Sequence, residues 1–237
     1  LLQSESGTGK TSLLRWIAGI SDKQMHAEGK ILLNGTDITE FPAEQRRIGI
    51  LFSEALLFPH LTVAENIGIG VASSISGKKR RDLITNSLIK AGLAGIEKQD
   101  PLTLSTGQQA RIALLRTLLS EPALLLLDEP LSNVDQSFKE EIQIQLKKIL
   151  KNLKITTIVV THDSYEAFYL GNKCGVILDE KLKQFDDPYK VYHYPNSVSV
   201  VNFLNRGILI PAKVTGKNTL ENDDLGTIEG KFLSLIH

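Results

Sequence analysis

The chain has 237 residues, of which 42% are hydrophobic, and its 27 basic residues balance its 27 acidic residues. This length and composition suffice for a buried core, and the balanced charge excludes a global attraction to nucleic acid or anionic lipid. Cys174 is the one cysteine, which excludes an internal disulfide. The longest apolar run, 123–127, is far shorter than the ~20 residues of a membrane-spanning helix. Any membrane role is therefore expected to come through a partner.

The first recognisable pattern is a phosphate-binding loop. Residues 4–12 read SESGTGKTS, which fits G-x-x-x-x-G-K-[ST] except that Ser4 stands at the first glycine position. The glycines let backbone N–H groups surround an anion, and residues 10–18 have the apolar spacing of a helix whose N-terminus favours phosphate. In this pattern the lysine reaches the β- and γ-phosphates and the following hydroxyl holds Mg²⁺. The predicted nucleotide site comprises Ser6, Gly7, Thr8, Gly9, Lys10, Thr11 and Ser12, with Thr11 also a metal ligand. A chance glycine-rich turn is the alternative.

The middle of the chain predicts a hairpin and then helices. Residues 29–38 turn at Asn34-Gly35, a strong hairpin signal, and residues 61–120 have mostly helical periodicity. Within LSTGQQ, at 104–109, Ser105 and Gln108 have the spacing of a capping box at a helix start. This helix start offers a hydroxyl, a glycine and amides to an anion, but no cation. The residues alone therefore favour a simple helix cap.

Two apolar runs predict buried parallel strands that end in polar residues. The run at 123–127 is followed by Asp128 and Glu129, and the run at 155–160 is soon followed by His162. Open α/β sheets bind ligands at the carboxyl edge, so we expect these side chains to meet there. Asp128 suits water-mediated coordination of Mg²⁺, and Glu129 suits polarising the attacking water. His162 is a candidate for contacting the γ-phosphate, although a lone histidine is more often structural.

The last third of the chain changes character. A helix is predicted over 136–153, another from Asp187-Pro188, and a third over 198–204. Beyond Arg206, short β-like runs alternate with turn residues. A segment of that length cannot bury a core of its own. We therefore expect a boundary near residue 205.

Five motifs in this order resemble the ATP-binding subunit of an ABC transporter: the phosphate loop, LSTGQQ, LLLLDEP, SNVD at 132–135 and THD at 161–163. The resemblance implies an α/β P-loop NTPase fold with a mostly parallel sheet, an antiparallel β segment and a helical arm. It also implies that 1–205 is the ATP-binding domain, with N-terminal strands missing, and that 206–237 begins a β-rich accessory domain. The implied ligands are ATP and Mg²⁺.

The resemblance further implies a set of partners. In that family the signature motif contacts the γ-phosphate held by a second subunit, so Ser105, Gly107 and Gln108 would act across a head-to-tail dimer, with Asp135 linking the two sites. The implied subunit sits on the cytoplasmic face of the cell membrane. It energises import through permease subunits, with a solute-binding protein acting indirectly and no nucleic acid involved. Ferric iron is favoured slightly over polyamine, sulfate or sugar as the solute.

Three residues depart from the family pattern. Ser4 and Thr106 replace glycines, and Ser53 replaces a glutamine that helps to coordinate Mg²⁺. Ser53 is shorter and is expected to reach the metal only through water. The β-branched Thr106 is expected to slow closure of the dimer. Two alternatives therefore stay open: a nucleotide-binding regulatory subunit with weak or no hydrolysis, and a soluble ABC-type ATPase acting on nucleic acid or ribosomes.

Overall fold

The computed structural model describes residues 1–4, 7–21, 24–134, 136–152, 155–205, 210–216 and 218–229. It forms two compact units, each described by itself below. Unit 1 comprises Leu1–Leu2 and Gly9–His162, and unit 2 comprises Gln3–Thr8 and Asp163–His237. The first boundary between the two units falls between Leu2 and Gln3, inside the short strand β1 (Leu2–Gln3). The predicted site residues Ser6 and Asp135 and the predicted helix end at Leu153 lie outside the described residues.

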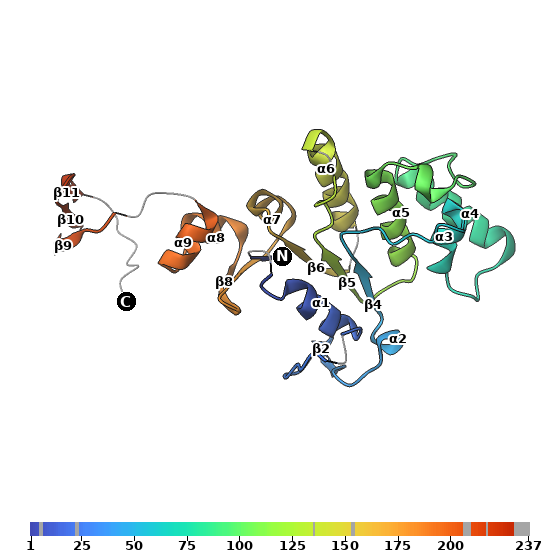
Figure 1. The fold of residues 1–237 in the computed structure, drawn as a ribbon, viewed down its shortest axis with the longest axis horizontal. Coiled ribbons are helices and arrows are strands. Elements are labelled where there is room, and N and C mark those ends of the chain that lie inside the picture. Colours follow the sequence, from blue (N-terminus) through green and yellow to red (C-terminus); the bar gives the residue numbers. More distant parts are fainter. Residues whose placement is uncertain are drawn as a thin grey trace. The chain divides into compact units, whose positions relative to one another are not determined.

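The core of unit 1 is a set of parallel strands, drawn as neighbouring arrows in Figure 1: β4 (Ile48–Leu51), β5 (Leu124–Asp128) and β6 (Thr156–Thr161). All five residues of β5 are buried, as the unbroken leucine run predicts for a strand covered on both faces. Leu124 and Leu126 pack with Leu14 of the first helix on one face of the sheet. The predicted strands are thus confirmed, and their carboxyl ends lie at one edge.

Helix α1 (Lys10–Ala18) covers that face of the sheet. It has the predicted bounds: it begins after Gly9 and ends at Gly19, whose φ of 78° lies in the left-handed region. The N–H of Gly19 donates to the carbonyl oxygens of Arg15 and Trp16, which closes the helix. Leu14 and Ala18 are buried, so the apolar face found in the sequence is the packed face.

The helices of the predicted arm follow β4 and are labelled in the cyan and green part of Figure 1: α3 (Val63–Ile69), α4 (Gly77–Lys90) and α5 (Thr106–Leu118). A short 3₁₀ helix, η1 (Pro101–Thr103), precedes α5. Residues of α3, α4 and α5 share one apolar cluster that includes Ile67, Leu88 and Ile112. A short helix, α2 (Ala43–Arg46), precedes β4. The predicted hairpin is formed by β2 (Leu32–Leu33) and β3 (Thr36–Asp37), and Asn34 and Gly35 both have positive φ in its turn. A last helix of unit 1, α6 (Gln136–Asn152), lies between β5 and β6 in the chain.

Unit 2 contains two strands and three helices before residue 205: α7 (Ser164–Leu170), β7 (Cys174–Leu178), β8 (Lys181–Asp186), α8 (Pro188–His193) and α9 (Val198–Leu204). The strands β7 and β8 pair antiparallel. Asp187 caps α8 by accepting the N–H of Lys190 at 3.0 Å, so the predicted Asp-Pro helix start is confirmed. Cys174 is buried, and burial raises the pKa of its thiol to about 11. A buried thiol with a raised pKa is a packing residue and not a nucleophile.

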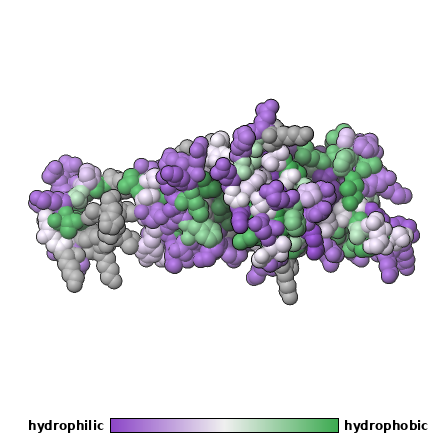
Figure 2. Space-filling view, turned by 90° about the horizontal axis from the view of Figure 1, so that it is seen from below, coloured by the Kyte–Doolittle hydropathy of each residue, from purple (hydrophilic) through white to green (hydrophobic). Residues whose placement is uncertain are grey.

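The residues after 205 form a small antiparallel sheet of β9 (Lys213–Gly216), β10 (Thr219–Asn222) and β11 (Gly226–Glu229). Its buried residue in the described strands is polar: Asn222 accepts the N–H groups of Asp224 and Leu225 and donates to the carbonyl of Pro211. A turn network therefore takes the place of an apolar core, which agrees with the β-rich character predicted here. No helix among the described residues combines the length and apolarity needed to span a bilayer. Figure 2 accordingly shows hydrophilic and hydrophobic residues mixed over the face that it draws.

Candidate nucleotide-binding site

The start of α1 is built for an anion. Gly9, the residue before the helix, has φ 81°, which a side chain would strain, and a Cβ at this position would meet nothing within 4 Å. Gly9 stands at the N-cap position and has no side chain with which to cap this helix start. The first N–H groups of a helix have no partner within the helix, and the helix dipole favours negative charge there. The start of α1 in unit 1 thus has the properties of a phosphate site.

Lys10, the first residue of α1, is 94% buried, with a relative exposure of 6%. Burial lowers the pKa of its ammonium, while the nearby carboxylates of Glu129 and Asp128 act in the opposite direction. A buried cation needs anionic partners, so its placement beside two carboxylates explains how the charge is tolerated. Lys10, Asp128 and Glu129 are therefore brought together, as the sequence predicted.

Asp128 is the last residue of β5 and is 6% exposed. Burial raises the pKa of its carboxyl group, while a hydrogen bond with the Thr11 side chain lowers it. One carboxylate oxygen, Oδ1, is buried and has no hydrogen-bond partner among the described residues. Leaving such an oxygen unpaired is costly, which points to a ligand that completes it.

These residues fit a magnesium ion. Mg²⁺ is usually bound by one or two protein oxygens together with substrate phosphates and water, and not by a cage of protein ligands. Consistent with this, the described residues contain no group of three or more His, Cys, Asp or Glu side chains that could hold a metal alone. The Oδ1 atom of Asp128 and the hydroxyl of Thr11 supply the expected oxygens at one place.

Glu129 and His162 form a pair at the same edge of the sheet. The Nδ1 atom of His162 lies 3.3 Å from Oε2 of Glu129, and their side chains are 51% and 27% exposed respectively. Glu129 has φ 48°, a conformation that is unusual for a residue with a side chain, and its N–H donates to the carbonyl of Val160 at 2.9 Å. Strained backbone of this kind is concentrated at functional sites. Both residues fall where the strand pattern predicted them.

Ser53 lies two residues beyond β4, whose last residue Leu51 is in register with Leu127 of β5. It is exposed, and its carbonyl accepts a hydrogen bond of 3.0 Å from Nδ2 of Asn133. Ser53 is thus placed at the edge that carries Asp128, and its described contact is made by its backbone. Its predicted role at the metal stays a prediction.

The LSTGQQ segment forms a satisfied helix cap. The N–H of Gln108 donates to Oγ of Ser105 at 3.3 Å, and the N–H of Ser105 donates to Oε1 of Gln108 at 3.0 Å. The predicted capping box is therefore confirmed. Gly107 is buried, and a Cβ there would lie 2.7 Å from Cδ1 of Ile142 on α6. A side chain at position 107 would therefore make the end of the Ile142 side chain shift, whereas Thr106 is exposed.

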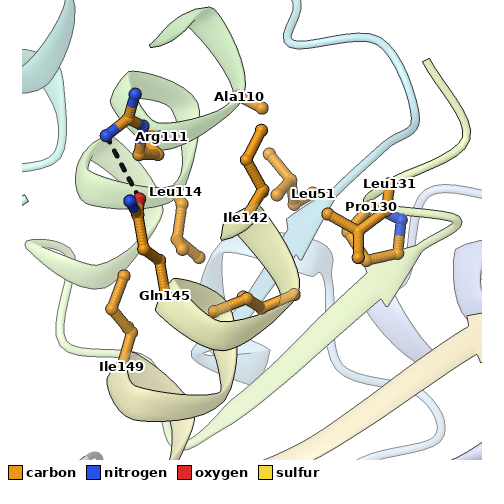
Figure 3. A pocket seen from close by; sticks show the side chains of 10 residues that line it. Leu51, Ala110, Arg111, Leu114, Pro130, Leu131, Ile142, Gln145 and Ile149 are labelled. Atoms are coloured by element: carbon orange, nitrogen blue, oxygen red, sulfur yellow. Dashed lines mark hydrogen bonds between the residues drawn. The ribbon is translucent and has the colours of Figure 1, made fainter. Parts of the chain in front are cut away.

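A small apolar cavity of about 30 Å³ lies between α5 and α6 (Figure 3). Leu114 and Ile142 line it together with Pro130 and Leu131, which directly follow Glu129. Beside it, Nη1 of Arg111 donates to Oε1 of Gln145 at 3.2 Å. The cavity is too small and too apolar for a nucleotide. It marks the packing between α5 and the segment that follows β5.

One charged neighbour of the site was missed from the sequence. The guanidinium of Arg15 acts on the Asp128 carboxylate and lies over the Phe52 ring, 5.7 Å from its centroid. Arg15 follows Thr11 by four residues, so both lie on one face of α1. The four-residue spacing between Thr11 and Arg15 was the sequence signal that could have predicted Arg15 near the site. Asn133 belongs to the SNVD segment, but its contact with Ser53 depends on the pairing of β4 and β5, which no local sequence pattern reveals.

The fold and the edge site define a P-loop NTPase of the ATP-binding cassette type. A model of the ABC transporter family matches residues 2–132, more than half of the chain. The chain belongs to this family. Among solved structures, the dimeric cassette MJ0796 bound to ADP and Pi, in a post-hydrolysis state, is 28% identical with a TM-score of 0.66, covering 79% of this chain and 84% of that chain. The predicted fold class is thereby confirmed.

Curated relatives are import ATP-binding proteins. The Fe(3+) ions import protein FbpC of Rhizobium etli is 37% identical over 216 residues, which are 91% of this chain and 60% of that protein. The spermidine/putrescine import protein PotA of Aliivibrio fischeri is 38% identical over 84% of this chain and 53% of its own length. The maltose/maltodextrin import protein MalK of Yersinia pestis is 38% identical over 89% and 57%. The chain therefore spans about 60% or less of the length of these relatives.

Proposed function

We propose that this chain is the subunit that binds and hydrolyses MgATP to energise solute import through an ABC transporter. The observation that carries the proposal is the buried, unpartnered Oδ1 of Asp128 beside Thr11 and Lys10. A helix start, a buried cation and an unsatisfied carboxylate oxygen together complement a polyphosphate with its metal. The relatives named for import support the transport role.

In the proposed complex the phosphates lie against the amides at the start of α1. Lys10 contributes its ammonium to the β- and γ-phosphates, and the preceding loop residues Ser6, Gly7 and Thr8 contribute amides, with Ser12 following on the helix. Asp128 and Thr11 hold Mg²⁺, directly or through water, and Ser53 acts through water. Mg²⁺ held by these residues would supply neutralisation of the charge that develops on the phosphate oxygens.

Glu129 is the proposed catalytic carboxylate. Its side chain is more exposed than that of Asp128, so it can reach a water molecule beside the γ-phosphate. The contact with Nδ1 of His162 holds the carboxylate in one orientation and leaves the other ring nitrogen of His162 for the γ-phosphate. Glu129 then polarises the attacking water, while phosphate charge is stabilised by Lys10.

A second ATPase subunit, in a head-to-tail dimer, is proposed as the partner of α5. Ser105, Gly107 and Gln108 would contact the nucleotide of that subunit, and Asp135 would link the two sites. Ser105 and Thr106 are exposed, which this role requires. Support comes from the similar cassette MJ0796, whose structure is dimeric.

The permease is proposed to dock at a cavity of about 380 Å³ whose lining includes Ser53. Leu56 and Leu102, both on its wall, are 55% and 68% exposed, a large exposure for two apolar side chains that line one cavity. Arg116 shapes this wall by donating to the carbonyls of Leu56 at 3.0 Å and Ala55 at 3.3 Å. Docking there would place the chain on the cytoplasmic face of the membrane. Ferric iron or a similar small solute is the proposed cargo.

A nucleotide-binding regulatory subunit with weak or no hydrolysis is the second candidate. It is favoured by Ser53, whose short side chain replaces the glutamine of the family pattern, and by the β-branched Thr106. These departures leave the features for nucleotide binding intact, because Lys10, Thr11 and Asp128 fit the pattern. The two candidates therefore agree on binding and differ in turnover.

Calorimetric titration of the protein with MgATP, followed by measurement of phosphate release, tests the proposal. We expect binding in the wild type and a loss of at least about tenfold in Lys10→Ala, since a charge-assisted contact to phosphate is removed. Lys78→Ala, at an exposed position on α4, is the matched control and should bind like the wild type. Absence of heat with folded wild type would refute nucleotide binding. Binding without phosphate release above background would favour the regulatory candidate.

A further inference from the structure

The departure at the first glycine position of the loop creates a contact. Ser4 is fully buried, and its Oγ forms a hydrogen bond with Oγ1 of Thr8, both within unit 2. We call this hydrogen bond the hydroxyl clasp. Ser4 is not among the residues with positive φ, so the serine is accommodated without backbone strain. A glycine at position 4 has no side chain and could not form the clasp.

The segment that enters the loop is anchored as well. Gln3, the last residue of β1, is fully buried, and its Nε2 donates a hydrogen bond to Oγ of Ser164, the first residue of α7. The side chains at positions 3 and 4 thus both make hydrogen bonds within unit 2. Gln3 thus ties the residue before the loop to α7, and Ser4 ties the first loop position to Thr8.

The two described glycines of the loop have unusual conformations. Gly7 and Gly9 have φ near +80°, and a Cβ at either position would meet nothing within 4 Å. Glycine has the greatest conformational freedom of all residues, so fixing these conformations carries an entropic cost. Ordering such a loop on binding an anion costs conformational entropy, and this cost reduces affinity. A bond that joins the side chains of Ser4 and Thr8 reduces the number of conformations available to Gly7, which lies between them in the chain.

We propose that the hydroxyl clasp between Ser4 and Thr8 pre-organises the phosphate loop, so that Ser4 is a positioning residue for the nucleotide phosphates. The inference rests on the proposed function, because it assumes that this loop binds phosphate. Ser4 acts through Thr8 and the loop backbone and does not touch the ligand. The serine thus replaces the freedom of a glycine by a specific contact.

The test uses four variants of the full chain: Ser4→Ala, Thr8→Val, the double variant and Thr8→Ser. The first three remove one or both hydroxyl groups, whereas Thr8→Ser keeps the hydroxyl and is the matched control. Affinity is measured by calorimetry with tripolyphosphate, which lacks base and sugar, and with MgATP. The turnover rate at saturating MgATP and the thermal unfolding of the nucleotide-free protein are measured in parallel.

We expect the dissociation constants of both ligands to rise by the same factor in Ser4→Ala and in Thr8→Val, roughly 2- to 10-fold for one lost hydrogen bond. The double variant should bind no more weakly than the weaker single variant, because the same bond is removed. Thr8→Ser should bind like the wild type. Turnover of Ser4→Ala at saturation should change less than twofold, since Ser4 does not touch the ligand and the clasp acts before the chemical step. A general loss of structure would lower turnover too, so this split separates positioning from folding.

Several results would overturn the clasp. Unchanged affinity in both single variants, or independent and additive losses in the double variant, would show that the two hydroxyl groups do not act together on the loop. If Ser4→Ala fails to fold at its buried position, Thr8→Val at the half-buried position decides alone. Wild-type binding that depends on Lys10 but not on Ser4 or Thr8 would refute the clasp and leave the proposed function standing. A wild type that binds neither ligand would refute both.

Discussion

The end of β5 and the start of α5 both present polar side chains, but only the end of β5 has a buried polar atom without a hydrogen-bond partner among the described residues. At the end of β5, Asp128 is 6% exposed and keeps one oxygen without a partner among the described residues. At the start of α5, Ser105 and Gln108 satisfy each other in a capping box. The first arrangement is unfavourable without a ligand, whereas the second is stable without one.

This difference separates two kinds of evidence for a binding site. A buried unsatisfied group indicates a ligand from the structure of one chain, because the folded protein alone leaves a cost uncompensated. A satisfied cap gives no such indication, so the proposed role of α5 rests on family resemblance and on a dimeric relative. Mutations at the two places should therefore behave differently.

The largest effect is expected from Glu129→Gln. If Glu129 polarises the attacking water as proposed, removing its carboxylate should lower the rate of phosphate release by about 100- to 10,000-fold, while MgATP binding persists. The measurement is single-turnover phosphate release together with calorimetric binding. Glu28→Gln, at an exposed position, is the matched control and should keep the wild-type rate. Equal rates for Glu129→Gln and wild type would contradict the catalytic role of the β5 edge.

Asp128→Asn tests whether the unpartnered oxygen is a cost. Burial raises the pKa of Asp128 in the folded protein, so this group favours folding below its ordinary value of 3.8, and that contribution is lost as pH rises through the raised pKa. In the nucleotide-free protein the asparagine variant should melt roughly 2–4 °C above wild type at pH 7. The gap should shrink as the pH falls toward 3.8, and thermal melts across this range measure it.

With MgATP present, the order should reverse. The wild type gains stability from the ligand, and the asparagine variant, which lacks the anionic oxygen, should gain much less. Two results would show that burying the Asp128 carboxylate carries no cost in stability: a melting difference that is independent of pH, or an asparagine variant that melts below wild type at pH 7. The comparison with α5 would then lose its basis.

Most of the fold followed from local patterns. The bounds of α1 follow from Gly9, Gly19 and the apolar spacing between them, and α9 has the predicted bounds Val198–Leu204. The buried leucines of β5 had no polar residue among them, so a strand covered on both faces was the one consistent interpretation. Such elements are predictable because their causes are adjacent in the sequence.

Contacts between distant segments were not predictable in the same way. The strand pattern placed Asp128, Glu129 and His162 at one edge, but the 3.3 Å contact between Glu129 and His162 depends on the pairing of β5 with β6. The position of Gly107 against Ile142 depends on how α5 and α6 pack. The sequence identified this glycine only as part of a motif, whereas the structure shows that it packs closely against the Ile142 side chain.

Ser105 offers a moderate effect that separates a cap from a ligand contact. Ser105→Ala should lower the free energy of unfolding by about 1 kcal/mol, because the N-cap hydrogen bond is lost. Ser105→Asn should keep the stability, since asparagine caps as well as serine. If Ser105 also contacts a nucleotide in the partner subunit, hydrolysis by Ser105→Asn should fall by roughly 3- to 10-fold, the worth of one hydrogen bond. Chemical denaturation and phosphate release measure the two effects. Full activity in Ser105→Asn would show that Ser105 acts only as a helix cap and does not contact the nucleotide.

The smallest effect is expected at Ser53. This residue lies at the same sheet edge as Asp128, but its described hydrogen bond is made by its backbone carbonyl and not by its side chain. Its carbonyl accepts the 3.0 Å hydrogen bond from Asn133, and a change of side chain preserves that bond. Ser53→Gln adds an amide long enough to reach the metal directly, so turnover should rise by about 2- to 5-fold, the scale of exchanging a water-mediated contact for a direct one. MgATP affinity should change little, because Lys10 and the start of α1 are unaltered. Steady-state phosphate release measures the gain, and Glu54→Gln, next in the chain and also exposed, controls for the added amide. A variant no faster than wild type would mean that the length of the side chain at position 53 does not limit hydrolysis. Metal binding at this edge would then depend on Asp128 and not on residue 53.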